Sequence, residues 1–306
     1  MVDIIDIKKF FRGFISLSEP LSKYTSFRIG GPADYYLEPA DKADVVAIVT
    51  YLQQQRVPHL IIGKGSNMLV SDEGVRGAVI NVEAGLNNIS VSGNVVTVEA
   101  GLSIARFVDF CIHHSLQGVE MLPGIPGTIG GAVVMNAGAY GGEISDHLLT
   151  VEVLRNGNVT TVSKQDSGFS YRHSNFQGDI ILGATFQLAP GDKQEIMKNR
   201  RELLIRRNRA QPVNFPNSGS MFKNPKGGFA AKLIEEAGLK GKRIGNAQIS
   251  DKHANFIVNH GNATAEEVLS LIELAKSAVA KKFKIELELE VKLIGFDEHV
   301  ERQEHE

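Results

Sequence analysis

A glycine-rich stretch at residues 123–142 constrains this chain more than any other feature of its sequence. Its twenty residues contain seven glycines, two prolines and no charged side chain before Glu143. Proline breaks helices and glycine weakens them, so an ordinary helix is not predicted here. The middle of the stretch, residues 129–135, is apolar enough to be buried, which argues against an ordinary loop. The stretch therefore predicts a backbone that approaches another group closely.

A second glycine turn, Gly63-Lys64-Gly65-Ser66-Asn67, directly follows a short apolar run at 59–62 that is predicted to be a strand. Such turns present bare backbone N–H groups, which can hold phosphates. The chain lacks the P-loop pattern with its lysine and lacks a clean Rossmann glycine pattern, so neither of those folds is predicted. Two glycine turns instead indicate one long anionic cofactor, a dinucleotide bound without a Rossmann fold. The alternative is a pair of tight turns packed against a sheet.

Length and charge exclude several classes of protein. The chain has 306 residues, enough for two or three domains, and its net charge of −2 argues against a general nucleic-acid binder. The single cysteine, Cys111, excludes an internal disulfide, and without HExxH or CxxC motifs no metal site is predicted. Residues 1–14 mix charged and apolar side chains unlike a signal peptide. No apolar run reaches the roughly 18 residues that span a membrane. We therefore expect a cytoplasmic protein.

The pattern along the chain predicts an α+β protein in three parts. Residues 1–70 form a small strand–helix–strand unit, and residues 71–192 form a unit dominated by strands. A basic helix at about 193–209 follows, whose arginines either bind anions or form a solvated face. Residues 210–296 form a compact α+β unit, and the charged end at 297–306 is predicted to be a frayed tail.

Hydrophobic periodicity and turn residues predict the individual elements. Asp41 is expected to cap the second helix, and Asn156-Gly157 to form a hairpin turn. We expect helices at 1–14, 41–55, 103–114, 193–209, 228–237 and 264–283. We expect strands at 33–39, 59–62, 77–82, 89–91, 95–98, 149–154, 159–162, 179–188, 255–259 and 285–294.

Three places carry side chains that suit catalysis. Ser220 lies in a polar loop that either positions its hydroxyl or simply links two domains; a serine hydrolase is not predicted, because G-x-S-x-G is absent. Arg172 lies among aromatic residues, where it either stacks as a structural group or faces an anion. The last predicted strand presents Glu286, Glu288 and Glu290 on one face. The residues alone do not choose among these carboxylates, and a solvated strand face is the alternative.

Seven stretches occur together in a telling order. They are YTSFRIGG at 24–31, GKGSN at 63–67, GIPGTIGGAVVMNAGAYGG at 124–142, Tyr171-Arg172, GSMFKNP at 219–225, KHANF at 252–256 and EVKLIG at 290–295. In number and order they closely resemble the UDP-N-acetylenolpyruvoylglucosamine reductases, flavoenzymes of peptidoglycan precursor synthesis, over nearly the whole chain. Met221 stands where an aromatic residue is common in that family, which we expect to have no functional consequence.

The resemblance implies a fold and a cofactor. The first two parts are expected to form a two-subdomain FAD-binding module of the vanillyl-alcohol-oxidase type, with the C-terminal strand returning near the first subdomain. The third part, an α+β domain, is expected to bind the substrate. FAD is expected to be held without a covalent bond. The FAD contacts implied are Gly63, Lys64, Gly65, Ser66, Asn67, Met68, Pro123, Gly124, Ile125, Gly127, Thr128, Gly130, Gly131, Ala132, Asn136, Ala137 and Ala139.

The resemblance also implies a reaction. In the family, NADPH reduces the flavin, and the enolpyruvyl group of UDP-N-acetylglucosamine enolpyruvate then takes a hydride and a proton to become a lactyl ether. The proton donor falls on Ser220, and the paired electrostatic groups fall on Arg172 and Glu290. Implied contacts to the UDP part are Tyr140, Asn224 and Lys240. The short interval between Arg172 and Ser220 indicates the shorter subclass (type II), which lacks a substrate-capping tyrosine loop.

Two alternatives remain at this stage. A flavin oxidase of the same fold would act on a small alcohol and usually attach its flavin through a histidine, but neither glycine turn contains one. A non-catalytic UDP-sugar-binding protein would have lost the residues at positions 172, 220 and 290, and all three are filled. The reductase is therefore the preferred prediction.

Overall fold

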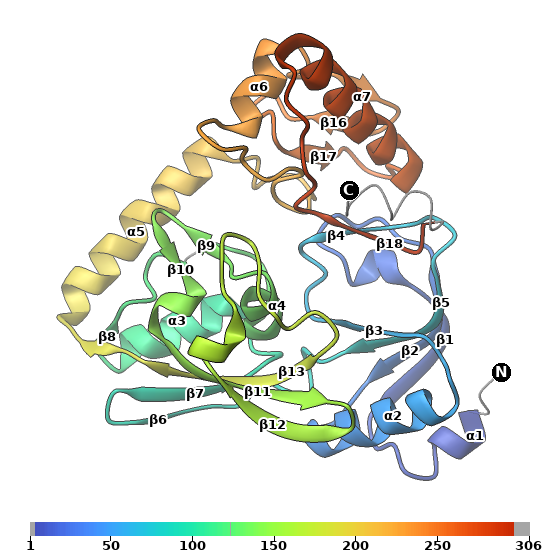
Figure 1. Cartoon of the computed structure of the whole chain (residues 1–306), viewed down its shortest axis with the longest axis vertical. Coiled ribbons are helices and arrows are strands. Elements are labelled where there is room, and N and C mark those ends of the chain that lie inside the picture. The colour runs from blue at the N-terminus through green and yellow to red at the C-terminus, as the bar shows by residue number, and fades with distance from the viewer. Residues whose placement is uncertain (1–3, 123, 297–306) are drawn as a thin grey trace. The chain divides into compact units, whose positions relative to one another are not determined.

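The computed structural model describes residues 4–122 and 124–296, and Figure 1 labels most of their helices and strands. They form two compact units, and the three consecutive parts expected from the sequence stay a prediction. The first unit takes in the chain up to Leu17, then Tyr35–Lys64 and Gly77–Arg207; the second takes in Ser18–Asp34, Gly65–Arg76 and the chain from Asn208 onward.

The first unit is built on sheets and four helices that pack on them. Its helices are α1 (Ile4–Ile7), α2 (Lys42–Gln54), α3 (Ile104–His113) and α4 (Ile129–Val134). Its strands are β3 (His59–Ile62), β6 (Ile89–Ser92), β7 (Val95–Glu99), β8 (Leu116–Gln117), β9 (Gly138–Ala139), β10 (Gly142–Glu143), β11 (Leu148–Arg155), β12 (Asn158–Ser163), β13 (Ile180–Gln187) and β14 (Ala189–Pro190). The unit boundaries fall within β1 (Phe14–Pro20), β2 (Pro32–Glu38), β5 (Val75–Asn81) and α5 (Lys193–Ala210). Short 3-10 helices are Ile144–His147 and Gln165–Ser167 in the first unit and Leu21–Lys23 in the second.

The largest sheet of the first unit is antiparallel, in the order β12-β11-β13-β7-β6. The turn between β11 and β12 confirms the predicted hairpin, because Asn156 and Gly157 both have positive φ. A second sheet has the order β1-β2-β5-β3, with β3 and β5 parallel. Apolar side chains from α2, α3, α4 and both sheets merge into one buried core. Helix α4 packs on β13 and β7, which places the glycine-rich stretch directly on the sheet.

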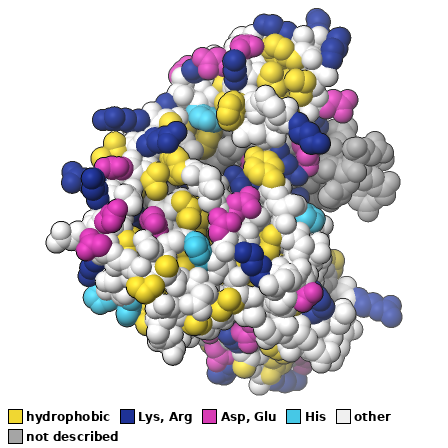
Figure 2. Space-filling model, turned by 60° about the vertical axis from the view of Figure 1, so that its left-hand side comes forward, with side chains coloured by type: hydrophobic (Ala, Val, Ile, Leu, Met, Phe, Trp, Pro, Cys, Tyr) yellow, Lys and Arg dark blue, Asp and Glu magenta, His cyan; other side chains and the backbone are white. Residues whose placement is uncertain are grey.

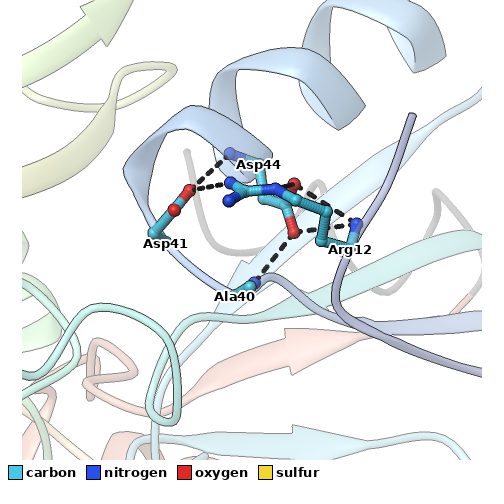
Figure 3. A network of polar contacts seen from close by, with 4 residues as sticks. All are labelled: Arg12, Ala40, Asp41 and Asp44. Carbon is cyan, nitrogen blue, oxygen red and sulfur yellow. Dashed lines mark hydrogen bonds and ion pairs between the residues drawn. The ribbon is translucent and has the colours of Figure 1, made fainter.

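A polar network fixes the start of α2 (Figure 3). The Asp41 carboxylate accepts the Asp44 backbone N–H at 3.0 Å, which confirms Asp41 as the N-cap. The Arg12 guanidinium donates to Asp41 at 2.6 Å and holds the pKa of that carboxyl below its ordinary value. The buried Asp44 carboxylate accepts the backbone N–H groups of Arg12 and Ala40 at 3.1 and 3.0 Å. The network therefore ties the chain before β1 to the N-terminus of this helix.

The second unit contains α6 (Ala230–Glu236), α7 (Ala265–Phe283) and the strands β4 (Met68–Val70), β15 (Arg243–Ile244), β16 (Ala247–Ile249), β17 (Ile257–Asn259) and β18 (Lys292–Ile294). The order β15-β16-β17 forms one sheet, and β18 pairs with β4 in parallel. Thr264 and Glu267 form the capping box that starts α7. One buried face of α7 joins the unit's own core.

Three predicted elements differ in the structure. The helix expected at 1–14 is limited, among described residues, to α1, and β1 begins at Phe14. The chain runs close to β2 there: a Cβ on Gly13 would meet the Glu38 carbonyl at 1.9 Å. The last strand is only β18, because residues 286–291 pair with an irregular loop. Helix α4 forms within the glycine-rich stretch, against the prediction, because packing on the sheet outweighs glycine's low helix propensity.

Two further observations concern the surface and the helices. On the face that Figure 2 draws, Lys and Arg side chains are interspersed with Asp and Glu. Among the described residues, no helix combines the length and apolar character that crossing a membrane requires.

Candidate active site

Within the first unit, Gly63 lies against the glycine-rich stretch. A Cβ on Gly63 would come within 2.4 Å of Thr128 Oγ1, so the turn after β3 lies against the residue that precedes α4. Gly127 has a φ of 139°, which only glycine adopts readily, and its carbonyl accepts the Ile104 N–H at 3.1 Å. Gly63 and Thr128, both predicted FAD contacts, are therefore neighbours in the structure. In the 63–67 turn, Lys64 Nζ lies 3.7 Å from Glu83 Oε1.

The first turn of α4 is partly used by the chain itself. The N–H groups of Ile129 and Gly130 donate to the carbonyls of Leu102 and Ala100, at 2.9 and 2.8 Å. A Cβ on Gly130 would lie 3.0 Å from the Ala100 Cβ, so a larger residue would fit there only if Ala100 moved slightly. Because these two N–H groups already have partners in the chain, they are not available to bind a phosphate of the expected cofactor.

Gly131, the next residue, has no such packing reason to be glycine. It is exposed, and the nearest atom to a Cβ added there is Thr128 Oγ1 at 3.7 Å, an ordinary contact. Glycine inside a helix costs about 0.5–1 kcal/mol relative to alanine. The packing around Gly131 gives no reason for this cost, and the backbone there is open to a close approach. This position fits a bound cofactor.

Asn136, just after α4, holds a buried acceptor without a partner. Its side chain is fully buried, and its Nδ2 donates to Glu143 Oε2 at 2.6 Å and to the Ser170 carbonyl at 3.0 Å. Within the described residues its Oδ1 has no hydrogen-bond partner. An unsatisfied buried acceptor costs about 1–3 kcal/mol, which a bound donor would recover. Asn136 therefore also fits the predicted cofactor.

Arg172 lies beside the same stretch. Its backbone has a φ of 54°, its Nη2 donates to the Gly138 carbonyl at 3.0 Å, and its Cζ lies 4.9 Å from the Tyr171 ring centroid. Because the neighbouring Ser170 carbonyl accepts from Asn136, the arginine loop is tied to the glycine-rich stretch at two points. The structure thus brings Arg172 next to several predicted FAD contacts and fixes a positive charge there.

Tyr140, a predicted substrate contact, lies against the basic helix. Its hydroxyl donates to the Leu203 carbonyl at 3.4 Å, and the Arg206 guanidinium lies 5.3 Å from its ring centroid. The tyrosine itself is exposed and has a φ of 56°.

The arginines of α5 are not a uniformly solvated face, one of the two options left open by the sequence. Arg200 is half-buried and pairs with Asp109 at 2.6 Å. Arg207 is half-buried beneath Gly124, whose added Cβ would meet the Arg207 Cδ at 2.7 Å. Burial lowers the pKa of Arg207. Sequence periodicity could not separate these two from their exposed neighbours.

In the second unit, the Ser220 loop is the middle of three adjoining segments. Ser220 forms an isolated bridge with Phe256, and the Met221 N–H donates to the Asn255 carbonyl at 2.8 Å. On the other side, the Glu290 N–H donates to the Met221 carbonyl at 2.8 Å. Ser220 and Glu290, the predicted proton donor and carboxylate, are seventy residues apart in the sequence but lie on adjoining backbone segments. Both residues are half-buried.

Asn67, which belongs to the second unit, is bonded to the segment that carries Glu290. Asn67 Nδ2 donates to the Glu290 carbonyl at 3.0 Å, and the Lys292 N–H donates to the Asn67 carbonyl at 3.0 Å. The strands that follow, β4 and β18, pair directly. A predicted FAD contact is thus bonded to the residue predicted to provide the carboxylate.

The structure also separates the three candidate carboxylates. Glu286 is exposed, and Glu288 forms an ion pair with Lys223. The Glu288 carbonyl accepts the Lys223 N–H, whereas the Glu290 N–H donates to the carbonyl of Met221, the residue directly after Ser220. Lys223, whose role the sequence did not show, is therefore engaged by Glu288.

The predicted substrate contacts of the second unit are exposed. Asn224 Oδ1 accepts the Ala230 N–H at 3.1 Å at the start of α6, and Lys240 pairs with Glu235 at 2.8 Å. His253 was not singled out from the sequence, although it stands in the KHANF stretch. Its Nδ1 is buried without a partner in the described residues, and burial lowers its pKa.

The remaining predicted FAD contacts divide between the units. Gly65, Ser66 and Met68 belong to the second unit, and Gly65 has a φ of 53° with its backbone close to the Tyr24 carbonyl. Pro123 lies outside the described residues. The remaining predicted FAD contacts of the glycine-rich stretch belong to the first unit; they are Gly124, Ile125, Ala132, Ala137 and Ala139.

Two family models match the chain. The C-terminal domain of UDP-N-acetylenolpyruvoylglucosamine reductase matches residues 211–294, and an FAD binding domain matches residues 33–163. These matches confirm the predicted α+β fold with an FAD-binding module and a C-terminal domain, and they confirm FAD as the cofactor.

Relatives match over nearly the full length. A UDP-N-acetylenolpyruvoylglucosamine reductase of Chloroherpeton thalassium is 45% identical and covers 99% of this chain and 100% of its own. One from Caldanaerobacter subterraneus subsp. tengcongensis is 46% identical, covering 92% of this chain and 94% of its own. The crystal structure of the Thermus caldophilus enzyme superposes with a TM-score of 0.81 at 36% identity, covering 93% of this chain and 100% of that one. The chain belongs to the UDP-N-acetylenolpyruvoylglucosamine reductase family.

Proposed function

We propose that this chain reduces the enolpyruvyl group of UDP-N-acetylglucosamine enolpyruvate to the D-lactyl ether of UDP-N-acetylmuramate, with NADPH as reductant. The reaction belongs to peptidoglycan precursor synthesis in the cytoplasm, and thereby to cell-wall formation, cell shape and division. The observation that carries the proposal is the hydrogen bond from the Glu290 N–H to the Met221 carbonyl, which joins the segment of Glu290 to the residue directly after Ser220.

FAD is held by the two glycine turns without a covalent bond. Gly131 leaves its backbone open to a close approach, and Asn136 Oδ1 offers an unused acceptor. When bound, FAD takes two electrons from NADPH and supplies the hydride for the substrate's methylene carbon. The other residues of the two turns that the resemblance implies remain proposed contacts.

The chain's own side chains manage charge and proton. As the carbon–carbon π bond breaks and a C–H bond forms at the methylene carbon, its electron pair moves onto the adjacent carbon and the substrate carboxylate. Arg172, fixed by Gly138, stabilises that negative charge where it develops. Ser220 then gives its proton to the adjacent carbon and recovers one from solvent. Glu290 polarises the carbon that accepts the proton and thereby supports the proton transfer from Ser220.

The UDP part is proposed to contact Tyr140, Asn224 and Lys240. In the structure Tyr140 already lies beside Arg206, and Lys240 beside Glu235. A diphosphate would compete with Glu235 for the Lys240 ammonium, because both are anions. As a member of the shorter subclass, the chain has no capping tyrosine loop to add to these contacts.

The state of the flavin tests the proposal. Purified protein is expected to be yellow, to release all of its colour on acid precipitation, and to bleach when NADPH is added without oxygen. Free FAD in the supernatant, measured by its fluorescence, should equal the protein-bound FAD. Colour retained in the pellet, or turnover with a small alcohol and oxygen without NADPH, would favour the flavin oxidase instead.

A further inference from the structure

The Ser220 loop has no regular secondary structure, yet its backbone is closely fixed. Residues 220–223 lie between residues 253–256 and 288–290, joined to both by backbone hydrogen bonds and isolated bridges. Short irregular segments of this kind depend on side chains to complete their bonding. In this loop the Asn255 side chain completes the bonding of the Phe222 backbone.

Asn255 is buried in the second unit. Its Oδ1 accepts the Phe222 N–H at 3.0 Å, and its Nδ2 donates to the Phe222 carbonyl at 2.8 Å. The amide thus pairs with both backbone groups of one residue, as a neighbouring strand would. The backbone carbonyl of Asn255 accepts the Met221 N–H at 2.8 Å. Asn255 therefore fixes the two residues that directly follow Ser220.

We infer that Asn255 is a positioning residue for the proton donor: its side-chain amide holds the backbone that follows Ser220 in register with the segment that carries Glu290. The inference rests on the proposed function. Met221 donates its N–H to the Asn255 backbone carbonyl and accepts the Glu290 N–H, while the Asn255 side-chain amide bonds to the next residue, Phe222. The Asn255 side chain and the segment that carries Glu290 therefore hold neighbouring residues of the same loop. Removing the amide would leave the two Phe222 groups buried without these partners, and the loop would shift to satisfy them.

A matched control exists in the same unit. Asn259 is buried to the same extent, and its side chain is also fully bonded: its Nδ2 donates to the Phe27 carbonyl at 3.0 Å, and its Oδ1 accepts the N–H groups of Gly261 and Ala263. None of those partners belongs to the Ser220 loop. Asn259→Ala should therefore destabilise the protein as Asn255→Ala does, without affecting proton delivery.

The experiment compares both variants as FAD-loaded enzyme by anaerobic stopped flow. We expect Asn255→Ala to bleach with NADPH at the wild-type rate, while reoxidation by the enolpyruvyl substrate slows about 100-fold, as displacement of a catalytic group by about 1 Å can cause. Asn259→Ala should keep both rates, with a similar fall in melting temperature. Equal effects of the two variants on reoxidation would overturn the inference.

A double variant tests whether the effect runs through Ser220. In the Ser220→Ala background, Asn255→Ala should slow reoxidation little further, because the group it positions is gone. Multiplying effects would show that Asn255 acts elsewhere, and the inference would be wrong. If the wild-type enzyme bleached with NADPH but was never reoxidised by the substrate, the proposed function itself would fail. That result is distinct from either variant outcome.

Discussion

Replacing Ser220 by alanine is expected to slow reoxidation of the reduced enzyme by roughly 10²–10⁴-fold, the usual contribution of a general acid. The serine is half-buried, its loop is fixed on both sides, and Glu290 is bonded to the next residue. Flavin reduction by NADPH should proceed at nearly the wild-type rate, because it needs no proton from this group. Anaerobic stopped-flow absorbance separates the two half-reactions.

Two further results qualify this prediction. Substrate affinity should change little, since one hydroxyl is lost from a large nucleotide-sugar contact, and Ser220→Cys should recover part of the rate because a thiol also donates a proton. If alanine slowed reduction as much as reoxidation, Ser220 would hold the site together rather than protonate the substrate.

The second large effect is expected at neighbouring glycines of α4. Gly131→Leu should weaken FAD binding roughly 5- to 150-fold, because overpacking costs about 1–3 kcal/mol where a bound group must approach the bare backbone. The apoprotein should unfold at the same or slightly higher denaturant concentration, since leucine favours helices by up to about 1 kcal/mol over glycine. FAD titration followed by fluorescence and urea unfolding measure the two effects.

Gly130→Leu is the matched comparison. A Cβ at this position meets Ala100, the residue directly after β7, at 3.0 Å, so the larger leucine side chain should weaken FAD binding and also lower apoprotein stability. An unchanged FAD affinity in Gly131→Leu would show that the exposed glycine faces solvent alone. The cofactor would then be held elsewhere.

Much of the fold followed from local signals. Asp41 and Thr264 cap their helices as side-chain oxygens do, and Asn156-Gly157 turns its hairpin. Helix α4 was missed because glycine propensity is local information, whereas the fit of Gly130 against Ala100 depends on the sheet beneath it. Strand β1 was missed for the same reason, since Gly13 is required by the neighbouring Glu38 carbonyl.

The candidate site was only partly accessible from the residues. Alternation placed Glu286, Glu288 and Glu290 on one face, but selecting Glu290 required its bond to Met221, a contact between irregular segments that leaves no periodic pattern. Resemblance to the family supplied that choice. The role of Asn255 was hidden for a similar reason, because its amide bonds to a backbone 33 residues away.

The most direct test is an anaerobic titration of the NADPH-reduced enzyme with UDP-N-acetylglucosamine enolpyruvate. The account predicts that one equivalent of substrate restores the full yellow colour and yields one equivalent of a product that is two hydrogens heavier, with a D-lactyl ether identified by mass spectrometry and NMR. Reduced enzyme that stays bleached with excess substrate, yet is reoxidised by oxygen, would contradict it.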